Sequence, residues 1–157
     1  MPKKVIGFVR DSLGNKAALE RQRSKIREYC DSKGYELGEI YEATGRWNVH
    51  QNDAQFSQLV SENPEAEALI VNEIGRLTHN FDEFKTILEM FRENGIEIES
   101  LDKRDQPILD ESHPSHKKVM GEFEFESSIL KENLAEYESA ALKESEESEE
   151  GESDYSR

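Results

Sequence analysis

The chain of 157 residues has one cysteine, four prolines and no long run of apolar residues. The single cysteine, Cys30, excludes a framework of internal disulfides and fits a small buried side chain in a reducing compartment. No stretch approaches the ~20 apolar residues of a membrane-spanning helix, and the start MPKKVIGF lacks the apolar core of a signal peptide. The sequence therefore predicts a soluble, cytoplasmic protein without a membrane partner.

Positive charge is scarce as well. The formal net charge is −15, from 35 acidic and 20 basic residues, and residues 144–157 (ESEESEEGESDYSR) hold seven acids and one arginine. This low-complexity segment is predicted to be a disordered acidic tail. The rest of the chain is acidic too, which argues against binding DNA through net charge, because DNA affinity comes from neutralising phosphates. An acidic surface also fits adaptation to concentrated salt.

Short apolar runs alternate with amphipathic segments along the first two thirds of the chain. The apolar runs predict strands at 4–10, within 35–43, at 68–72 and at 96–101. The segments between them predict helices at 16–33, 52–63 and 80–94, with Asn15 before the first helix and Gly34 after it. This alternation predicts an α/β fold with a parallel sheet of four or five strands between layers of helices.

The C-terminal third has a different pattern. Residues 102–118 form a polar stretch that predicts a loop, and its HPSH sequence lacks a third metal ligand at suitable spacing. From Val119 to about Lys143 a narrow apolar stripe that includes Phe123 and Leu130 predicts one long helix. A small domain cannot cover a helix of that length, so the stripe indicates packing within or between subunits. We therefore divide the chain into a domain at 1–118, an oligomerisation helix at 119–143 and the tail at 144–157.

Polar side chains that suit phosphate chemistry follow two of the predicted strands. Since ligands bind at the carboxyl ends of parallel strands, we expect one rim to carry Ser12, Arg10, Arg76 and Gln22. Arginine binds phosphate through two hydrogen bonds, and a serine without a nearby histidine base does not fit an acyl-transfer triad. The set fits a hydroxyl directed at a phosphodiester. Two simpler alternatives remain: Ser12 shapes the turn, and Arg76 pairs with Glu73.

Four sequence segments in this order resemble one known family: GFVRDS, ALERQ, ALIVNEIGRLTHN and FEFESSILKEN. Together they resemble the catalytic domain of serine recombinases of the resolvase/invertase type, over about residues 4–135. The resemblance implies a three-layer α/β domain at 1–118 whose nucleophile, Ser12, attacks a DNA phosphodiester. It implies that Arg10 and Arg76 hold the phosphate, that Gln22 supports them, and that no metal or other cofactor is needed. Dimers or tetramers would form through the long helix.

The resemblance also implies supporting roles for Arg46 and Glu132 and a DNA contact for Lys131. The chain departs from the family's motifs at several positions where arginine or aspartate is usual: Asp53, Gly75, His79, Ser127 and Asn133. Because the loss of one preorganised donor costs roughly 10²–10³ in rate, these departures predict weak or conditional activity.

A second hypothesis comes from a different functional class. The family usually continues into a DNA-binding region, and the acidic segment stands in its place here. The chain would then be a catalytically impaired, recombinase-like interaction protein that regulates a full-length recombinase by mixed assembly. The ordered survival of Arg10, Ser12, Gln22 and Arg76 favours the enzyme.

Overall fold

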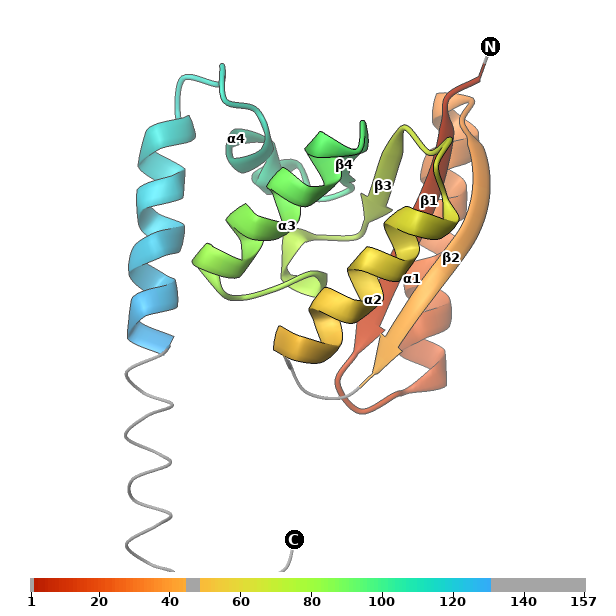
Figure 1. The fold of residues 1–157 in the computed structure, drawn as a ribbon, viewed down its shortest axis with the longest axis horizontal. Helices are drawn as coiled ribbons and strands as arrows, with labels where there is room; N and C mark the ends of the chain where they lie inside the picture. Colours follow the sequence, from red (N-terminus) through yellow and green to blue (C-terminus); the bar gives the residue numbers. More distant parts are fainter. Residues whose placement is uncertain (1, 45–48, 131–157) are drawn as a thin grey trace, which may run out of the picture.

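The computed structural model describes residues 2–44 and 49–130, without the side chains of residues 49–53. One parallel sheet has the strand order β2-β1-β3-β4 (Figure 1), with β1 at Lys4–Asp11, β2 at Glu36–Thr44, β3 at Ala68–Val71 and β4 at Glu97–Ser100. The main helices are α1 at Lys16–Lys33, α2 at Val49–Glu62 and α3 at Phe81–Glu93. Shorter helices are η1 at Ile74–Arg76, η2 at Lys103–Asp105 and α4 at Gln106–Leu109, and a further helix covers residues 116–130. The predicted α/β fold with a parallel sheet is confirmed.

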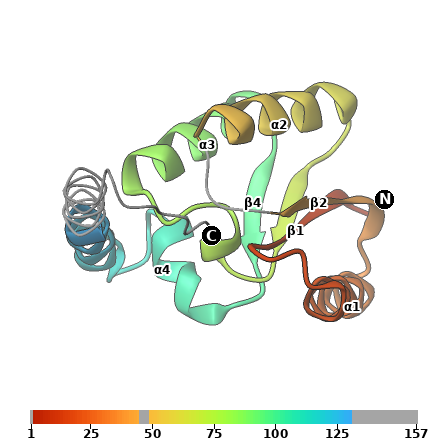
Figure 2. The ribbon, with the colours of Figure 1, turned by 90° about the horizontal axis from the view of Figure 1, so that it is seen from below.

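The sheet lies between two layers of helices. Figure 2 shows α1 on one face and α2 with α3 on the other. Successive side chains of a strand point to opposite faces, so Val5 and Val9 of β1 join the core under α1, while Ile6 and Phe8 join the core under α2 and α3. The centre of β1 is therefore buried on both sides, which explains the continuous apolar run VIGFV.

Helix α1 packs closely on β1 and ends where the sequence predicts. A Cβ at Gly7 would lie 3.2 Å from Ile40 Cγ1 and 3.3 Å from Ile26 Cγ2, so the absence of a side chain permits this close packing. At the start of α1, the side chain of Asn15 accepts the N–H of Ala18 at 2.9 Å. At its end, Gly34 adopts a left-handed conformation with φ of 72°.

The segment predicted to be a loop at 102–118 contains η2, α4 and the first residues of the last helix, which begins at 116 and not at 119. Pro107 lies in the first turn of α4, where its missing N–H costs no hydrogen bond. His113 Nδ1 accepts the N–H of Ser115 at 3.0 Å, and His116 Nδ1 lies 2.8 Å from the carbonyl oxygen of Pro107. Local hydrogen bonds of this kind can order a polar segment whose apolar residues have no regular spacing.

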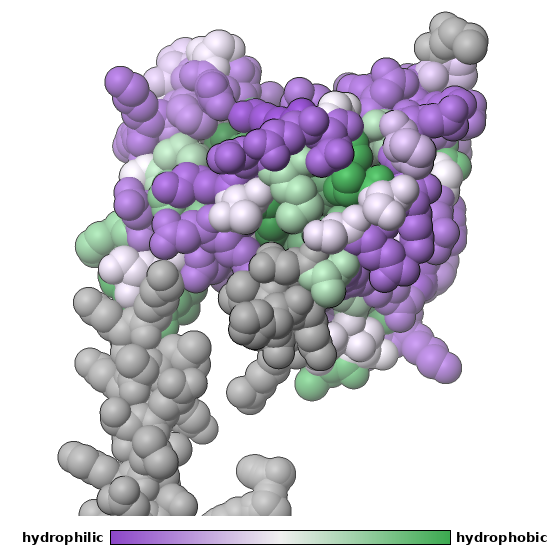
Figure 3. Space-filling model, viewed as in Figure 1, coloured by the Kyte–Doolittle hydropathy of each residue, from purple (hydrophilic) through white to green (hydrophobic). Residues whose placement is uncertain are grey.

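The last helix packs against α3. The ring of Phe123 lies 5.4 Å from that of Phe81 and 5.6 Å from that of Phe84, so this residue of the predicted stripe is packed within the chain. On the same helix Phe125 and Leu130 are 65% and 54% exposed, and Figure 3 shows hydrophobic atoms at its lower end. The predicted continuation to 143 and the tail at 144–157 lie outside the described residues. No helix within 2–44 and 49–130 is long and apolar enough to cross a membrane.

A half-buried carboxylate ties β4 to the N-terminus and to α1. Glu99 accepts hydrogen bonds from Lys3 Nζ at 3.0 Å, from the Tyr29 hydroxyl at 2.8 Å and from the Tyr35 hydroxyl at 3.0 Å. Burial alone would raise the pKa of Glu99, but the three donors outweigh it, and the pKa lies below its usual value.

The contribution of Glu99 to stability should therefore depend on pH. Since the folded pKa is depressed, the stabilisation is present above about pH 4, where a glutamate of the unfolded chain is ionised, and is lost as the pH falls through the folded value. Glu99→Gln should be less stable than the wild type at neutral pH, and urea unfolding should show the gap closing in acid. The exposed neighbour Glu97 provides the control, Glu97→Gln. A gap that stays constant with pH would contradict the assignment.

Candidate active site

The predicted rim lies at the point where the strand order of the sheet reverses. The connection from β1 leads to β2 on one side, whereas β3 lies on the other side of β1. In open α/β sheets, ligands bind at the carboxyl ends of the strands at such a point. Arg10 stands near the end of β1, and Arg76 closes η1 directly after β3.

The two arginines hold each other's backbone. Arg10 donates from Nε to the carbonyl oxygen of Arg76 at 3.2 Å, and Arg76 donates from Nη1 to the carbonyl oxygen of Arg10 at 3.2 Å. Arg76 Nε also lies 3.3 Å from Glu73 Oε1. The predicted pairing of Arg76 with Glu73 is therefore present, together with the contact to Arg10.

Gln22 fixes the end of β1 to α1. Its Oε1 accepts the N–H of Arg10 at 3.0 Å, and its Nε2 donates to the carbonyl oxygen of Arg10 at 2.9 Å. The Gln22 side chain is buried, so both bonds are shielded from water. The structure thus brings together three of the predicted site residues, Arg10, Gln22 and Arg76.

A buried acid that sequence reasoning missed accompanies Arg10. Arg10 is 6% and Glu83 is 8% exposed. Burial lowers the pKa of the Arg10 guanidinium, and the negative charge of Glu83 opposes that shift. Thr78 Oγ1 donates to Glu83 Oε1 at 2.8 Å, which holds the carboxylate in place. In the sequence, Glu83 has the pattern of an ordinary acid in the first turn of a helix.

Ser12 stands on the exposed turn after β1. The turn is held by Asp11, whose Oδ2 accepts the N–H groups of Leu13 at 3.2 Å and Asn15 at 2.8 Å, and by Gly14 with φ of 68°. The turn-shaping role that the sequence left open for Ser12 therefore belongs to Asp11. Within the described part of the chain, no hydrogen bond joins the Ser12 hydroxyl to Arg10, Gln22 or Arg76.

Comparison with known proteins shows which family the chain belongs to. The family model "Resolvase, N terminal domain" matches residues 5–147. The chain belongs to this family. The resemblance seen in the four motifs is confirmed, and the fold is that of a resolvase-type catalytic domain. A search of curated protein sequences gives no match.

Solved structures of two recombinases and an integrase share the fold. The catalytic domain of ISC1926 TnpA, an IS607-like serine recombinase, is 26% identical over 62% of this chain and 70% of that one, with a TM-score of 0.55. The N-terminal catalytic domain of TP901-1 integrase is 21% identical over 87% and 99%, with a TM-score of 0.54. A resolvase family site-specific recombinase from Streptococcus pneumoniae is 16% identical over 92% and 99%, with a TM-score of 0.61.

Two departures from the resolvase motifs lie against each other. A Cβ at Gly75 would lie 3.2 Å from His79 Cε1, so the histidine ring takes space that a larger residue at 75 would need. A third departure, Ser127, is buried, and its Oγ accepts the N–H of Phe81 at 3.0 Å, which ties the last helix to α3.

The remaining predicted residues cannot be placed in the site. Arg46, Lys131 and Glu132, and with them the departure at Asn133, lie outside the described residues, and the side chain of Asp53 does so as well. Their roles stay predictions.

Proposed function

We propose that this resolvase-type domain cleaves and exchanges DNA strands, with Ser12 as the nucleophile. The observation that carries the proposal is the linkage of Arg10, Gln22 and Arg76 at the reversal of strand order, with Ser12 on the exposed turn two residues after Arg10. In this reaction Ser12 Oγ bonds to phosphorus as the bond from phosphorus to the 3′ oxygen breaks. The serine proton is lost, and the 3′ oxygen takes up a proton. The products are a 5′-phosphoserine link and a free 3′-hydroxyl.

The two guanidiniums would stabilise the charge on the phosphate during this step. Such donors act most strongly when the protein already holds them in position, and the contacts between Arg10 and Arg76 do so. Gly75 and His79 supply none of the charged groups that the family motif has at these two positions, so we propose weak or conditional activity. Arg46 and Glu132 as supporting residues and Lys131 as a DNA contact complete the proposal.

DNA is the proposed substrate, and a dimer or tetramer is the proposed assembly. Phe125, Ile129 and Leu130 are exposed on the last helix, where a second subunit could cover them. The same surface favours a second candidate function, in which the chain joins a full-length recombinase in a mixed assembly and regulates it. The net charge of −15 also fits that role, because such a chain would add little DNA affinity of its own.

A covalent-trapping experiment tests the nucleophile. The full chain is incubated with supercoiled DNA that carries its genomic flanks, from low salt up to molar potassium chloride, and then denatured. We expect a protein–DNA adduct that Ser12→Ala abolishes, because the link passes through the Ser12 oxygen.

Ser24→Ala is the matched control, since Ser24 is an exposed serine on the outer side of α1. It should leave the adduct at the wild-type level. If the folded wild type forms no adduct at any salt concentration, the enzymatic proposal is wrong and the regulatory function is favoured. Co-purification with a full-length recombinase would then be the next measurement.

A further inference from the structure

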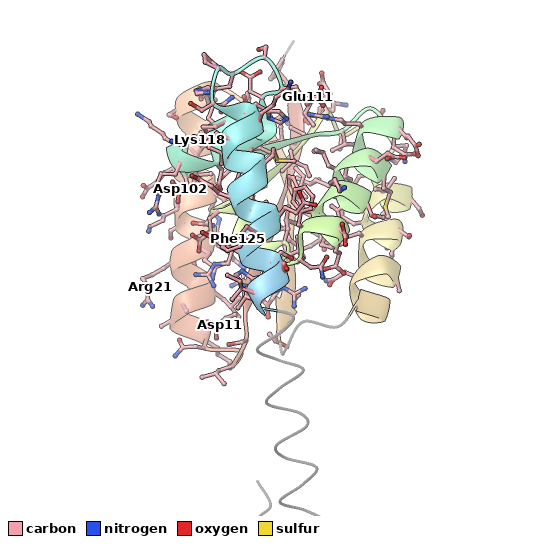
Figure 4. The ribbon with its side chains drawn as sticks, turned by 90° about the vertical axis from the view of Figure 1, so that its left-hand side faces the viewer. Asp11, Arg21, Asp102, Glu111, Lys118 and Phe125 are labelled. Atoms are coloured by element: carbon pink, nitrogen blue, oxygen red, sulfur yellow. The ribbon has the colours of Figure 1, made fainter. Side chains whose placement is uncertain are left out.

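A polar groove of about 410 Å³ lies next to the candidate active site, between α1 and the segments that follow β3 and β4. It shares Gln22 and Arg76 with that site and is also lined by Arg21 and Lys25 of α1. Figure 4 shows Arg21 projecting outward from α1, with Asp102 of the opposite rim on the same side of the molecule. The groove therefore extends from the candidate active site along the surface of α1.

The acids of the groove already have basic partners. Glu73 lies against Arg76, and Asp102 accepts hydrogen bonds from Arg104 at 2.8–3.2 Å. The contact with Arg104 lowers the pKa of Asp102, so this carboxylate is ionised and paired near neutrality. Neither acid is left to balance the remaining cations of the groove.

Arg21 and Lys25 are both exposed, and neither forms an ion pair with any residue in the described part of the chain. They stand four positions apart on α1, where like charges face each other and cost a helix about 0.2–0.5 kcal/mol. By contrast, Arg23 and Arg27 on the same helix are paired, with Glu20 and, for Arg23, also with Glu42. In a chain with 35 acids, two adjacent cations without acidic partners fit a site for an external anion.

We propose that Arg21 and Lys25 bind phosphates of the DNA strand that flank the phosphodiester held by Arg10 and Arg76. This inference rests on the proposed function and adds a binding surface to it. Four helical residues rise about 6 Å, so Arg21 and Lys25 can contact two different phosphates of one strand. A DNA strand whose phosphate sits at Arg76 would thus have its next phosphates within reach of α1. Binding there would also relieve the repulsion between the two cations.

The test is fluorescence anisotropy with the full chain and a short labelled DNA duplex, over a series of salt concentrations. Arg21→Ala/Lys25→Ala should bind the duplex about tenfold more weakly at low salt, and the slope of log affinity against log salt should fall by about 2. Arg21→Lys/Lys25→Arg keeps both charges and should bind like the wild type. Both residues are exposed, so thermal unfolding should show that every variant is folded.

Arg23→Ala/Arg27→Ala is the matched control, because it removes the same charge from the same helix outside the groove. Equal losses in the two double variants would overturn the proposal and show an effect of net charge alone. Tighter binding by Arg21→Ala/Lys25→Ala would overturn it as well, and would show that an acidic segment of the chain occupies the groove.

The covalent-trapping result separates this inference from the proposed function. If the Ser12 adduct forms and the groove variants bind DNA like their control, the proposed DNA contacts of Arg21 and Lys25 are wrong and the enzymatic proposal is supported. If no adduct forms but DNA binding depends on Arg21 and Lys25, the proposed cleavage by Ser12 is wrong and the proposed DNA contacts in the groove are supported. If the wild type binds no DNA at any salt concentration, both are wrong.

Discussion

Replacing Glu83 by glutamine is expected to lower the free energy of unfolding by about 3 kcal/mol, because it removes a buried negative charge that offsets the burial of the Arg10 guanidinium. The shape of the side chain is retained, and glutamine Oε1 can still accept the hydrogen bond from Thr78. The loss should therefore report charge and not packing. Urea denaturation of the wild type and Glu83→Gln at neutral pH measures it.

The neighbouring acid provides a control for this prediction. Asp82 lies in the same first turn of α3, but its side chain is 72% exposed and lies 3.9 Å from Lys85. Asp82→Asn removes the same charge near the helix N-terminus, where an exposed acid contributes at most about 1 kcal/mol. If both variants lose the same stability, burial beside Arg10 is not the cause. We expect Arg10→Met to restore part of the stability that Glu83→Gln loses, because it removes the buried charge as well. If burial beside Arg10 is not the cause, the double variant should be no more stable than Glu83→Gln.

Gln22→Ala is expected to destabilise the fold by roughly 2–4 kcal/mol and to weaken adduct formation as well. The variant leaves the N–H of Arg10 buried without its acceptor, while the Arg10 carbonyl keeps its bond from Arg76. The end of β1 would then no longer be tied to α1, and the Arg10 guanidinium would lose its fixed direction. Chemical denaturation measures the first effect, and covalent trapping on the folded fraction measures the second.

Gln58→Ala serves as the comparison for Gln22, because Gln58 is an exposed glutamine whose amide donates to Glu62 Oε2 at 2.9 Å on the same helix. Its loss should change stability by less than about 0.5 kcal/mol. A Gln22→Ala variant that is as stable as Gln58→Ala would show that the two bonds to Arg10 are replaced by water.

The helices and strands up to residue 101 could be predicted because their apolar periods are strong and their ends carry specific residues. Asn15 and Gly34 mark α1 from both sides, and Gly95, with φ of 76°, stands after α3. The region at 102–118 could not be predicted in the same way. There Asp105 Oδ2 accepts the N–H of Ile74 at 2.8 Å, a contact with a segment 31 residues away in the sequence.

The candidate site was predictable only in part for a similar reason. The ordered motifs located Arg10, Ser12, Gln22 and Arg76, and the topology of a parallel sheet placed them on one rim. The buried partner of Arg10, Glu83, belongs to α3, where an acid in the first turn needs no special explanation. The packing of His79 over Gly75 depends on the local turn of η1, which no spacing rule describes.

Both edge strands of the four-stranded sheet carry exposed acids, and this has a consequence for aggregation. Edge strands present unpaired backbone groups that can join another sheet. The edge strand β2 contains the exposed acids Glu36 and Glu39, which have no ion pair among the described residues, and the edge strand β4 contains the exposed acid Glu97. When two copies approach edge to edge, these like charges repel each other. Fibre-like growth by strand addition is thereby disfavoured, even at high protein concentration.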